Sequence, residues 1–437
     1  MPNLKTRPLK GIITVPGDKS ISHRAVMFGA LAKGTTEVTN FLQGEDCLST
    51  IHCFKQLGIE IKNDPSQDTV TIYGKGLHGL TRPDHILDVG NSGTTMRLLS
   101  GILSGQSFDS SLTGDASIQK RPMGRIMAPL KLMGADIRSE KENDCAPLMI
   151  NNISNVASKA TTTRIKGIHY PSPVSSAQVK SCVLLAGLYA EGETSVTEPF
   201  LSRNHTELML SEFGATIKSD GTTVTILPEP YLAGRKIAVP GDISSAAYLI
   251  VAALIVPNSE LIIRNVGINP TRDGLLTICR NMGANIALEN VTFSGGEPVA
   301  DIHVRYSELI GTEIGGGIIP TLIDEIPVLA VLACFAKGRT VIKDAQELKV
   351  KESNRIDIMV KNLSLMRADI TATEDGMIIN GGKPLHGAVI ETMSDHRIAM
   401  SFAIAGLMSE GETVILNPEC VDISFPGFYT NLLKLQI

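Results

Sequence analysis

The chain has 437 residues, more than a single hydrophobic core usually serves, so we expect at least two domains. Hydrophobic residues make up 43% and charged residues 19%, a balance typical of a globular protein with ample apolar surface to bury. The net charge of −5 argues against a general nucleic-acid binder. Trp is absent and aromatic residues are 4%, which leaves little with which to build base-stacking surfaces.

The cysteines and the apolar runs indicate a reducing compartment and no membrane anchor. The seven cysteines form no CxxC pair and lie mostly in apolar helical context, so we expect small buried thiols rather than zinc ligands or disulfides. The start, MPNLKTRPLKGIITVPGD, lacks the apolar segment of a signal peptide. The longest apolar run, Ala246 to Val256, ends at Pro257 and is far shorter than the roughly 20 residues of a membrane span. We therefore expect a cytoplasmic protein.

One pattern occurs six times along the chain. A helix of small and apolar residues is followed by a Gly turn and a β-branched strand, at 22–38, 94–112, 177–196, 245–263, 326–342 and 396–415. A second helical segment then ends on a shared sequence, such as FKQLGIEI at 54–61 or LKLMGADI at 130–137, and NLLKLQI closes the sixth repeat. Short alternating segments such as DTVTIYG follow and predict strands.

Each repeat therefore predicts a helix, a strand, a helix and two further strands. The first helix is apolar on nearly all sides and must be covered all round, so we expect three such helices inside three small sheets, twice over. The opening motif VPGD at Val15 recurs at Val239. This recurrence predicts a first lobe of 15–238 and a second lobe of 1–14 plus 239–437, with a hinge near 15 and 239. Two lobes suit ligand binding by closure.

Basic residues gather at the first turns of the predicted helices, where unpaired N–H groups and the helix dipole attract anions. Lys19 precedes Ser20, the expected N-cap, and Arg24 follows one turn later. Later repeats add Arg97, a hairpin with Lys120, Arg121 and Arg125, then Arg203, Lys349, Lys351, Arg355 and Arg397. A single cation at a helix end is more often simply solvated. Five of six repeats sharing the feature in an acidic protein indicate a strongly positive site for phosphates, carboxylates or both.

The fourth repeat is the exception. It keeps Pro-Gly-Asp but has Ile243, Ala247 and Tyr248 where the first repeat has Lys19, His23 and Arg24. We therefore interpret Pro-Gly-Asp and the apolar helix as scaffold and expect no anion site at the start of this fourth helix.

Three acidic or titratable side chains lie close to the predicted cations. Asp324, Glu352 and His396 each stand within a few residues of a Lys or Arg, which is the material of general acid–base catalysis. Simple charge balance explains them equally well at this stage. The sequence contains no GxxxxGK[ST], no strand-anchored GxGxxG, no HExxH and no Cys/His ligand spacing, so neither nucleotide binding by those motifs nor a zinc site is indicated.

Eight motifs in fixed order cover essentially the whole chain: GDKSISHRA, GNSGTTMRL, DASIQKRPMGRI, SSAQVKS, SRNHTE, IDEIPVLA, KVKESNRI and SDHRIAMSFA. Together they resemble the enolpyruvyl transferases, and most closely the 5-enolpyruvylshikimate-3-phosphate (EPSP) synthase family in its second bacterial class. The resemblance implies an α/β fold of two lobes, each inverse α/β barrel-like and built of three βαβαββ repeats. It also implies a monomer that requires no cofactor and no metal and has only small-molecule partners.

The activity that the resemblance implies is that of a 3-phosphoshikimate 1-carboxyvinyltransferase in the shikimate pathway of aromatic amino acid biosynthesis. The enolpyruvyl group of phosphoenolpyruvate is transferred to the 5-hydroxyl of shikimate 3-phosphate, and phosphate is released. The family is also the target of glyphosate, which occupies the phosphoenolpyruvate site. Gly93 leaves room there, whereas Ala at this position is associated with tolerance, so we expect sensitivity.

The resemblance also assigns roles to individual residues. Shikimate 3-phosphate is expected to contact Lys19, Ser20, Arg24, Ser176, Ala177, Gln178, Arg203, Asp324 and Lys351. Phosphoenolpyruvate is expected to contact Lys19, Gly93, Arg121, Gln178, Arg355 and Arg397. The catalytic residues would be Asp324, which takes the proton of the 5-hydroxyl, Glu352, which exchanges a proton with the methylene carbon, and Lys19.

Two positions depart from the family pattern, and two other functions remain open. Ile423 stands where some members have a Lys that touches phosphoenolpyruvate, and Glu347 stands where some use Asn for the shikimate phosphate. The UDP-N-acetylglucosamine enolpyruvyl transferases share the fold, but they open with Lys-Asn and place a Cys in the loop that here is GDASIQKRPMG. A non-catalytic anion-binding scaffold is the other alternative, although it would not require Asp324 and Glu352.

Overall fold

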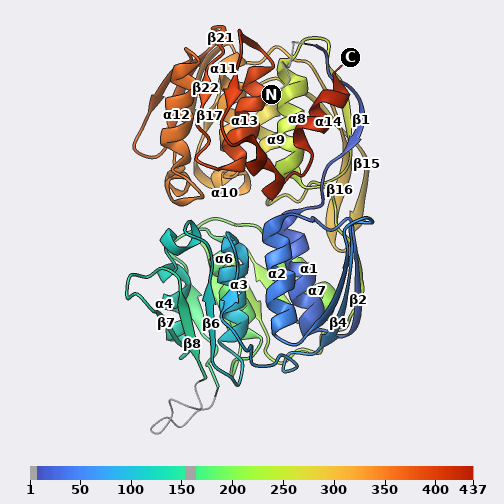
Figure 1. The fold of residues 1–437 in the computed structure, drawn as a ribbon, viewed down its shortest axis with the longest axis vertical. Helices are drawn as coiled ribbons and strands as arrows, with labels where there is room; N and C mark the ends of the chain where they lie inside the picture. Colours follow the sequence, from blue (N-terminus) through green and yellow to red (C-terminus); the bar gives the residue numbers. More distant parts are fainter. Residues whose placement is uncertain (1–6, 153–163, 437) are drawn as a thin grey trace. The chain divides into compact units, whose positions relative to one another are not determined.

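The computed structural model describes residues 7–152 and 164–436, and the chain forms two compact units (Figure 1). Unit 1 comprises Met1–Asp18, Pro240–Phe293 and Glu297–Ile437, and unit 2 comprises Lys19–Val239 and Ser294–Gly296. Each unit encloses its own hydrophobic core. We describe each unit by itself, and a hinge near Val15 and Val239 stays a prediction.

Unit 2 contains three of the predicted repeats. The first has α1 (Lys19–Leu31), β2 (Lys33–Thr39), α2 (Glu45–Gln56), β3 (Glu60–Asp64) and β4 (Thr69–Lys75). The second has β5 (Leu87–Asp88), α3 (Gly93–Leu103), β6 (Ser110–Thr113), the 3₁₀ turn η1 (Ile118–Lys120), α4 (Gly124–Leu132), β7 (Asp136–Ser139) and β8 (Leu148–Asn151). The third has β9 (His169–Pro171), α6 (Ala177–Gly187), β10 (Thr194–Thr197), α7 (His205–Phe213), β11 (Ile217–Asp220), β12 (Thr223–Ile226) and β13 (Lys236–Ala238).

Unit 1 contains the other three repeats. The fourth uses β1 (Lys10–Thr14), α8 (Ile243–Ile255), β14 (Glu260–Gly267), α9 (Gly274–Asn281), β15 (Asn285–Ser294) and β16 (Glu297–Arg305). The fifth has β17 (Glu313–Ile314), η2 (Gly316–Ile318), α10 (Ile319–Leu322), α11 (Ile326–Phe335), β18 (Gly338–Ile342), η3 (Gln346–Val350), α12 (Arg355–Leu365), β19 (Asp369–Ala372) and β20 (Met377–Gly381). The sixth has β21 (Leu385–His386), β22 (Val389–Ile390), α13 (His396–Gly406), β23 (Ser409–Glu410), β24 (Val414–Ile415), η4 (Pro418–Ile423) and α14 (Phe428–Leu435).

The sheets repeat one strand order. The sheets β13-β2-β4-β3, β5-β6-β8-β7, β9-β10-β12-β11, β1-β14-β16-β15 and β17-β18-β20-β19 have four strands each. In each of these sheets the first strand runs parallel to the second, as β1 does beside β14. The strands β5, β9 and β17 come just before the apolar helix of their own repeat, whereas β1 and β13 come from more distant segments. The sixth repeat has two pairs instead, β21-β23 and β22-β24. The predicted six-fold α/β pattern is therefore confirmed.

The first helix of each repeat lies in the core. Every residue of α8 is buried, and so is every residue of α1 from Ile21 to Leu31. In unit 1, α8, α11 and α13 contact one another, and in unit 2, α3 contacts both α1 and α6. Each of these helices also packs on the sheet of its own repeat, as α1 does on β2 and β4 (Figure 1). A helix without a polar face is thus covered on all sides.

Pro-Gly-Asp has a structural role that explains its recurrence. Its two copies pair with each other inside unit 1, where the backbone N–H of Asp18 donates to the carbonyl of Pro240 at 2.8 Å. A matching bond of 2.9 Å joins the N–H of Asp242 to the carbonyl of Pro16. Asp242 is also the N-cap of α8, and its side chain accepts from the N–H of Ser244 at 2.8 Å.

All seven cysteines are free thiols, and all but Cys145 are buried, as expected. Across residues 7–152 and 164–436, no single helix is long and apolar enough to span a bilayer. The segments Gly316–Leu322 and Ile326–Phe335 are together long and apolar enough, but the chain bends by 110° between them.

Close helix packing in unit 2 makes a testable prediction at Gly101. A Cβ at this position of α3 would lie 2.2 Å from the carbonyl oxygen of Cys182 in α6, so the helices have to separate to admit a methyl group. We expect Gly101→Ala to lower the free energy of unfolding by about 1–3 kcal/mol, measured by denaturant titration. Gly267→Ala is the control, because its Cβ would meet atoms no closer than 3.6 Å. Equal stability of the two variants contradicts the close packing.

Candidate active site

In the described chain, the apolar helices α3, α6, α8 and α13 each have an N-cap side chain that accepts a hydrogen bond from a backbone N–H. Ser92 caps α3 and accepts from the N–H of Thr95 at 3.0 Å, and Ser176 caps α6. The prediction that Ser20 caps α1 is wrong, because α1 begins at Lys19 and Ser20 lies inside its first turn. Asp18 precedes the helix there, at the position that the cap Asp242 has before α8.

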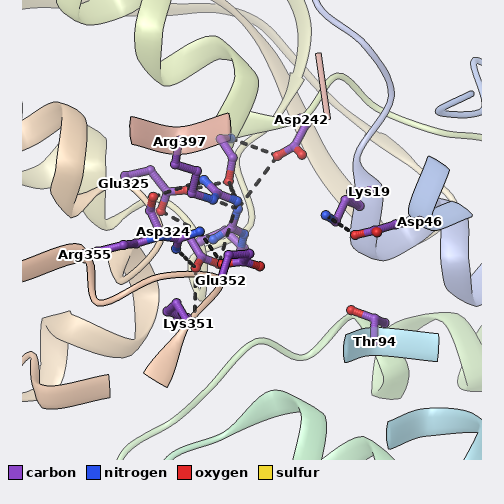
Figure 2. Close-up of polar contacts among 12 residues, drawn as sticks. Lys19, Asp46, Thr94, Asp242, Asp324, Glu325, Lys351, Glu352, Arg355 and Arg397 are labelled. Atoms are coloured by element: carbon purple, nitrogen blue, oxygen red, sulfur yellow. Dashed lines mark hydrogen bonds and ion pairs between the residues drawn. The ribbon is translucent and has the colours of Figure 1, made fainter. Parts of the chain in front are cut away.

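The start of α1 carries two cations that differ in exposure. The Nζ atom of Lys19 lies 2.5 Å from Oδ2 of Asp46, which belongs to the first turn of α2, and Figure 2 shows the pair. Arg24 is buried, and its guanidinium donates to the carbonyl of Ser20 at 2.9 Å, to Ser181 Oγ at 3.0 Å and to Thr206 Oγ1 at 2.7 Å. Arg24 therefore joins α1 to α6 and α7.

A second group in unit 2 surrounds the first residue of α3, Gly93. Arg97 donates to Oε1 of Gln178 at 2.5 Å, and the amide of Gln178 donates to Thr94 Oγ1 at 3.2 Å. Arg121 donates to Oδ1 of Asn91 at 2.5 Å. A Cβ on Gly93 would lie 2.9 Å from Nη1 of Arg97 and 3.2 Å from Nη1 of Arg121. The glycine thus leaves room for two guanidinium groups.

The hairpin predicted for Lys120, Arg121 and Arg125 is wrong. The segment forms the 3₁₀ turn η1 and the start of α4, since the carboxylate of Asp115 accepts from the backbone N–H groups of Ser117 and Ile118 and starts a turn there. Lys120 is exposed, whereas Arg121 is buried.

The remaining predicted residues of unit 2 lie just before and within helices. Ser176 and Ala177 stand at the start of α6, and the backbone N–H of Ser176 donates to Oε1 of Glu198 at 2.9 Å. Arg203 is half-buried and precedes α7 by two residues.

In unit 1, three cations surround the carboxylate of Asp324, which lies between α10 and α11 (Figure 2). Lys351 Nζ is 3.3 Å and Arg355 Nη1 is 3.4 Å from Oδ1, and Arg397 Nη2 is 3.9 Å from Oδ2. Arg397 also donates to the backbone carbonyl of Asp324 at 3.0 Å. Arg355 donates in addition to Glu352. The structure thus brings together all five residues predicted in this unit.

A buried carboxylate behind these cations holds Arg355. Asp395 caps α13, accepts from Nε of Arg355 at 2.9 Å and accepts from Ser353 Oγ at 2.9 Å. Burial would raise the pKa of Asp395, but the adjacent guanidinium of Arg355 outweighs it and lowers that pKa below its ordinary value. Neighbouring carboxylates in turn raise the pKa of Arg355, against the effect of burial. The Arg355–Asp395 pair is therefore an ion pair at neutral pH.

The fourth repeat also has a cation at the start of α8, which the sequence did not predict, while the absence of an anion site there stays a prediction. Arg272 donates to Ser244 Oγ at 2.6 Å, and its Nη2 is 3.4 Å from Oε1 of Glu325 and 3.8 Å from Oδ1 of Asp242. Ser244 donates in turn to Glu325, and Arg397 Nη1 is 3.6 Å from Oε1 of Glu325. Sequence reasoning missed Arg272, although it precedes α9 by two residues, as Arg203 precedes α7.

Carboxylates accompany the cations around Asp324 in unit 1 and, in unit 2, Lys19. Each of Lys19, Arg272, Lys351, Arg355 and Arg397 has a carboxylate within 4 Å. Buried or half-buried charges need such partners, since an isolated charge is costly to remove from water. Binding of an anion would therefore exchange partners around existing cations.

Other predicted or singled-out positions take less part in these contacts. His396 is buried at the start of α13, and Ile423 packs half-buried against the unit 1 core and supplies no cation. Glu347 lies half-buried in η3. In the part of the chain that the structure describes, no group of three or more His, Cys, Asp or Glu side chains is placed to hold a metal ion.

Comparison with solved structures places the fold in a class. The chain is similar to the enolpyruvyl transferase NikO from Streptomyces tendae, with a TM-score of 0.78 at 16% identity, covering 99% of this chain and 96% of that one. At this identity the likeness concerns the fold alone. The fold is thus that of an enolpyruvyl transferase, as the motifs predicted.

Closer relatives define the family. The EPSP synthase (3-phosphoshikimate 1-carboxyvinyltransferase) family model matches residues 4–432. A 3-phosphoshikimate 1-carboxyvinyltransferase of Thermoanaerobacter sp. (strain X514) is 56% identical over 425 residues, 97% of both chains, and that of Brevibacillus brevis is 55% identical over 432 residues, 99% of both. The EPSP synthase structure from Acinetobacter baumannii has a TM-score of 0.87 and 48% identity, covering 99% of this chain and 96% of that one. The chain belongs to the EPSP synthase family.

The buried Asp242 makes a pH-dependent prediction. Burial, and next the nearby Asp18, raise the pKa of Asp242 from 3.8 to about 6, although Arg272 and Arg397 act against them. An acid whose pKa rises on folding destabilises the folded state as pH increases from its unfolded to its folded pKa, so stability falls between about pH 4 and 6. Asp242→Asn keeps a capping oxygen and leaves Glu325 to pair with Arg272.

We expect Asp242→Asn to be more stable than the wild type at pH 7.5, by on the order of 2 kcal/mol, and equally stable below pH 4. Thermal unfolding across this pH range measures the difference. A variant that is less stable at pH 7.5 would mean that attraction to Arg272 outweighs burial of the carboxylate.

Proposed function

We propose that this chain catalyses transfer of the enolpyruvyl group of phosphoenolpyruvate to the 5-hydroxyl of shikimate 3-phosphate, with release of phosphate, as a 3-phosphoshikimate 1-carboxyvinyltransferase of aromatic amino acid biosynthesis. The observation that supports this most is the carboxylate of Asp324 among Lys351, Arg355 and Arg397, with Glu352 bound to Arg355. The site combines cations for two anionic substrates with two carboxylates for proton transfer. The proposed enzyme is a cytoplasmic monomer that requires neither metal nor organic cofactor.

In this mechanism Asp324 is the base. It takes the proton of the 5-hydroxyl while that oxygen forms a bond to the substituted alkene carbon of phosphoenolpyruvate. Lys351, at 3.3 Å from Asp324, supports the same role and contacts the shikimate ring hydroxyls.

Glu352 is the acid and later the base. It gives a proton to the methylene carbon of phosphoenolpyruvate, which yields a tetrahedral intermediate with a methyl group. Loss of phosphate and return of one methyl proton to Glu352 then restore the alkene in the product. The Glu352 side chain is 27% exposed, whereas that of Asp324 is 11% exposed, so the two carboxylates have different surroundings, as separate acid and base roles require.

Each of the two substrates has its own set of proposed contact residues. Shikimate 3-phosphate contacts Lys19, Ser20, Arg24, Ser176, Ala177, Gln178, Arg203, Asp324 and Lys351. Phosphoenolpyruvate contacts Lys19, Gly93, Arg121, Gln178, Arg355 and Arg397. In unit 2, the polar helix starts of α1, α3 and α6 support these assignments, because helix N-termini and guanidinium groups both favour phosphate.

The substrate-pair assay tests the proposal. Purified protein should release phosphate from phosphoenolpyruvate only when shikimate 3-phosphate is present, with unchanged rates after treatment with a chelator. Release with UDP-N-acetylglucosamine instead would make the chain a UDP-N-acetylglucosamine enolpyruvyl transferase. Release with neither acceptor would contradict catalysis and favour an anion-binding scaffold.

Glu352→Gln tests the proton-transfer role. The amide keeps the size of the side chain and a hydrogen-bond acceptor for Arg355 but cannot deliver a proton to carbon, so we expect kcat to fall by about 10²–10⁴-fold. Binding of both substrates, measured by calorimetry, should change little. Glu374→Gln is the control, because Glu374 is exposed and has no assigned role. Turnover that survives Glu352→Gln would refute the assignment.

Gly93→Ala tests the phosphoenolpyruvate site. The added methyl meets the ends of two flexible side chains, Arg97 and Arg121, so the fold should persist while both guanidinium groups shift. We expect the KM for phosphoenolpyruvate to rise about threefold to tenfold, with a larger rise in the glyphosate concentration that inhibits by half. An unchanged KM and unchanged inhibition would place the site elsewhere.

A further inference from the structure

A fully buried lysine lies beside the proposed shikimate 3-phosphate residues of unit 2. Lys180, in the second turn of α6, has no exposed surface, and its Nζ is 2.9 Å from Oε2 of Glu198 and 2.8 Å from Oε1 of Glu207. Both carboxylates are buried as well. Three charges in a dry core are costly unless they pair closely, and the mechanism above gives none of them a role.

Glu198 has a second set of contacts, which Glu207 lacks. Oε1 of Glu198 accepts from the backbone N–H of Ser176 at 2.9 Å. Oε2 accepts from the N–H of Ser202 at 3.2 Å and from its hydroxyl at 2.8 Å. Lys180 adds a bond to the carbonyl of Ser202 at 3.3 Å. Glu198 therefore ties together the segment that enters α6 and the segment that enters α7.

The position of Glu198 is fixed by the sheet. It follows directly after β10, which lies between β9 and β12, and its N–H donates to the carbonyl of Thr222 at 3.0 Å. Lys180 fixes the carboxylate from the side of α6. Because both the backbone and the carboxylate of Glu198 are fixed, the carboxylate can set the geometry of the groups that bond to it.

The two segments carry every shikimate 3-phosphate residue assigned to the third repeat. Ser176, Ala177 and Gln178 begin α6, and Arg203 directly follows Ser202. Hydrogen bonds also join the two helices further along. Ser181 of α6 bonds to Thr206 of α7 at 2.7 Å, and both hydroxyls accept from Arg24.

We propose that the buried Lys180–Glu198 ion pair is a positioning device for shikimate 3-phosphate, which sets Ser176 and Arg203 in register with each other. The inference rests on the proposed function. Neither residue touches substrate; each acts through the backbone of the two segments. Of the residues assigned to phosphoenolpyruvate, only Gln178 belongs to these two segments. The device should therefore affect shikimate 3-phosphate far more than phosphoenolpyruvate.

Two matched variants separate positioning from charge compensation. Glu198→Gln and Glu207→Gln each remove one negative charge from the side of the same Lys180, at buried sites, by the same chemical change. Only Glu198→Gln also places an amide N–H₂ against donors that the carboxylate now binds. Within the described residues, Lys180 is the one polar contact of the Glu207 carboxylate, so Glu207→Gln removes charge without disturbing backbone contacts.

Calorimetric binding and steady-state kinetics of the full chain test the inference. We expect Glu198→Gln to raise the Kd and KM of shikimate 3-phosphate by about tenfold to hundredfold, since a small misplacement of binding groups has effects of this size. The KM of phosphoenolpyruvate should change less than about twofold, and Glu207→Gln should leave the Kd of shikimate 3-phosphate within about threefold. Equal effects of the two variants, or equal effects on both substrates, overturn it.

A milder variant covers the case in which Glu198→Gln does not fold. Ser202→Ala removes one hydroxyl donor to Glu198 and leaves the ion pair intact, and it should weaken shikimate 3-phosphate binding by about threefold to tenfold. Unchanged binding in Ser202→Ala overturns the inference. Failure of the wild type to bind shikimate 3-phosphate at all would instead refute the proposed function on which the inference rests.

Discussion

The pairing of charges at the ends of buried helices is the interaction on which the rest of the structure depends. The apolar helices offer no polar face, so polar side chains gather at their N-terminal ends, where N–H donors are unpaired. A cation placed there is partly removed from water and needs a carboxylate. Asp395 serves Arg355, and Glu325 serves Arg272. The same pairs fix the directions of these side chains before any substrate is present, which lowers the cost of organising the site.

The helices were predictable because each has a recognisable local sequence pattern. A segment of small and apolar residues followed by a turn and a β-branched strand identified the first helix of every repeat, and the shared ending identified the second. Strand pairing was less predictable, because partners can lie far apart in sequence: β1 pairs with β14, some 250 residues later. The helix start at Lys19 was missed by two residues, since Asp18 and Ser20 are both good capping residues and local sequence does not choose between them.

Site residues were predictable where a charged side chain lies at or near a predicted helix start. Lys351, Arg355 and Arg397 were expected near Asp324, and the structure brings all of them to its carboxylate. Asp395, the buried partner of Arg355, was not foreseen. Asp46 reaches Lys19 from a different helix, so its role depends on tertiary packing rather than on any motif. In unit 1, Lys351, Arg355 and Arg397 are therefore paired with carboxylates, which a count of basic residues at helix starts does not reveal.

The most direct test of pre-organisation is the Nε–H resonance of Arg355 in the ligand-free protein, labelled with ¹⁵N-arginine and assigned through Arg355→Lys. Because Nε donates to Asp395 at 2.9 Å in a buried site, we expect a resolved signal that exchanges slowly with water and that is lost or averaged in Asp395→Asn. An exposed residue such as Arg82 gives the averaged reference signal. A wild-type Arg355 signal that matches Arg82 would contradict the claim that buried carboxylates hold the cations in place.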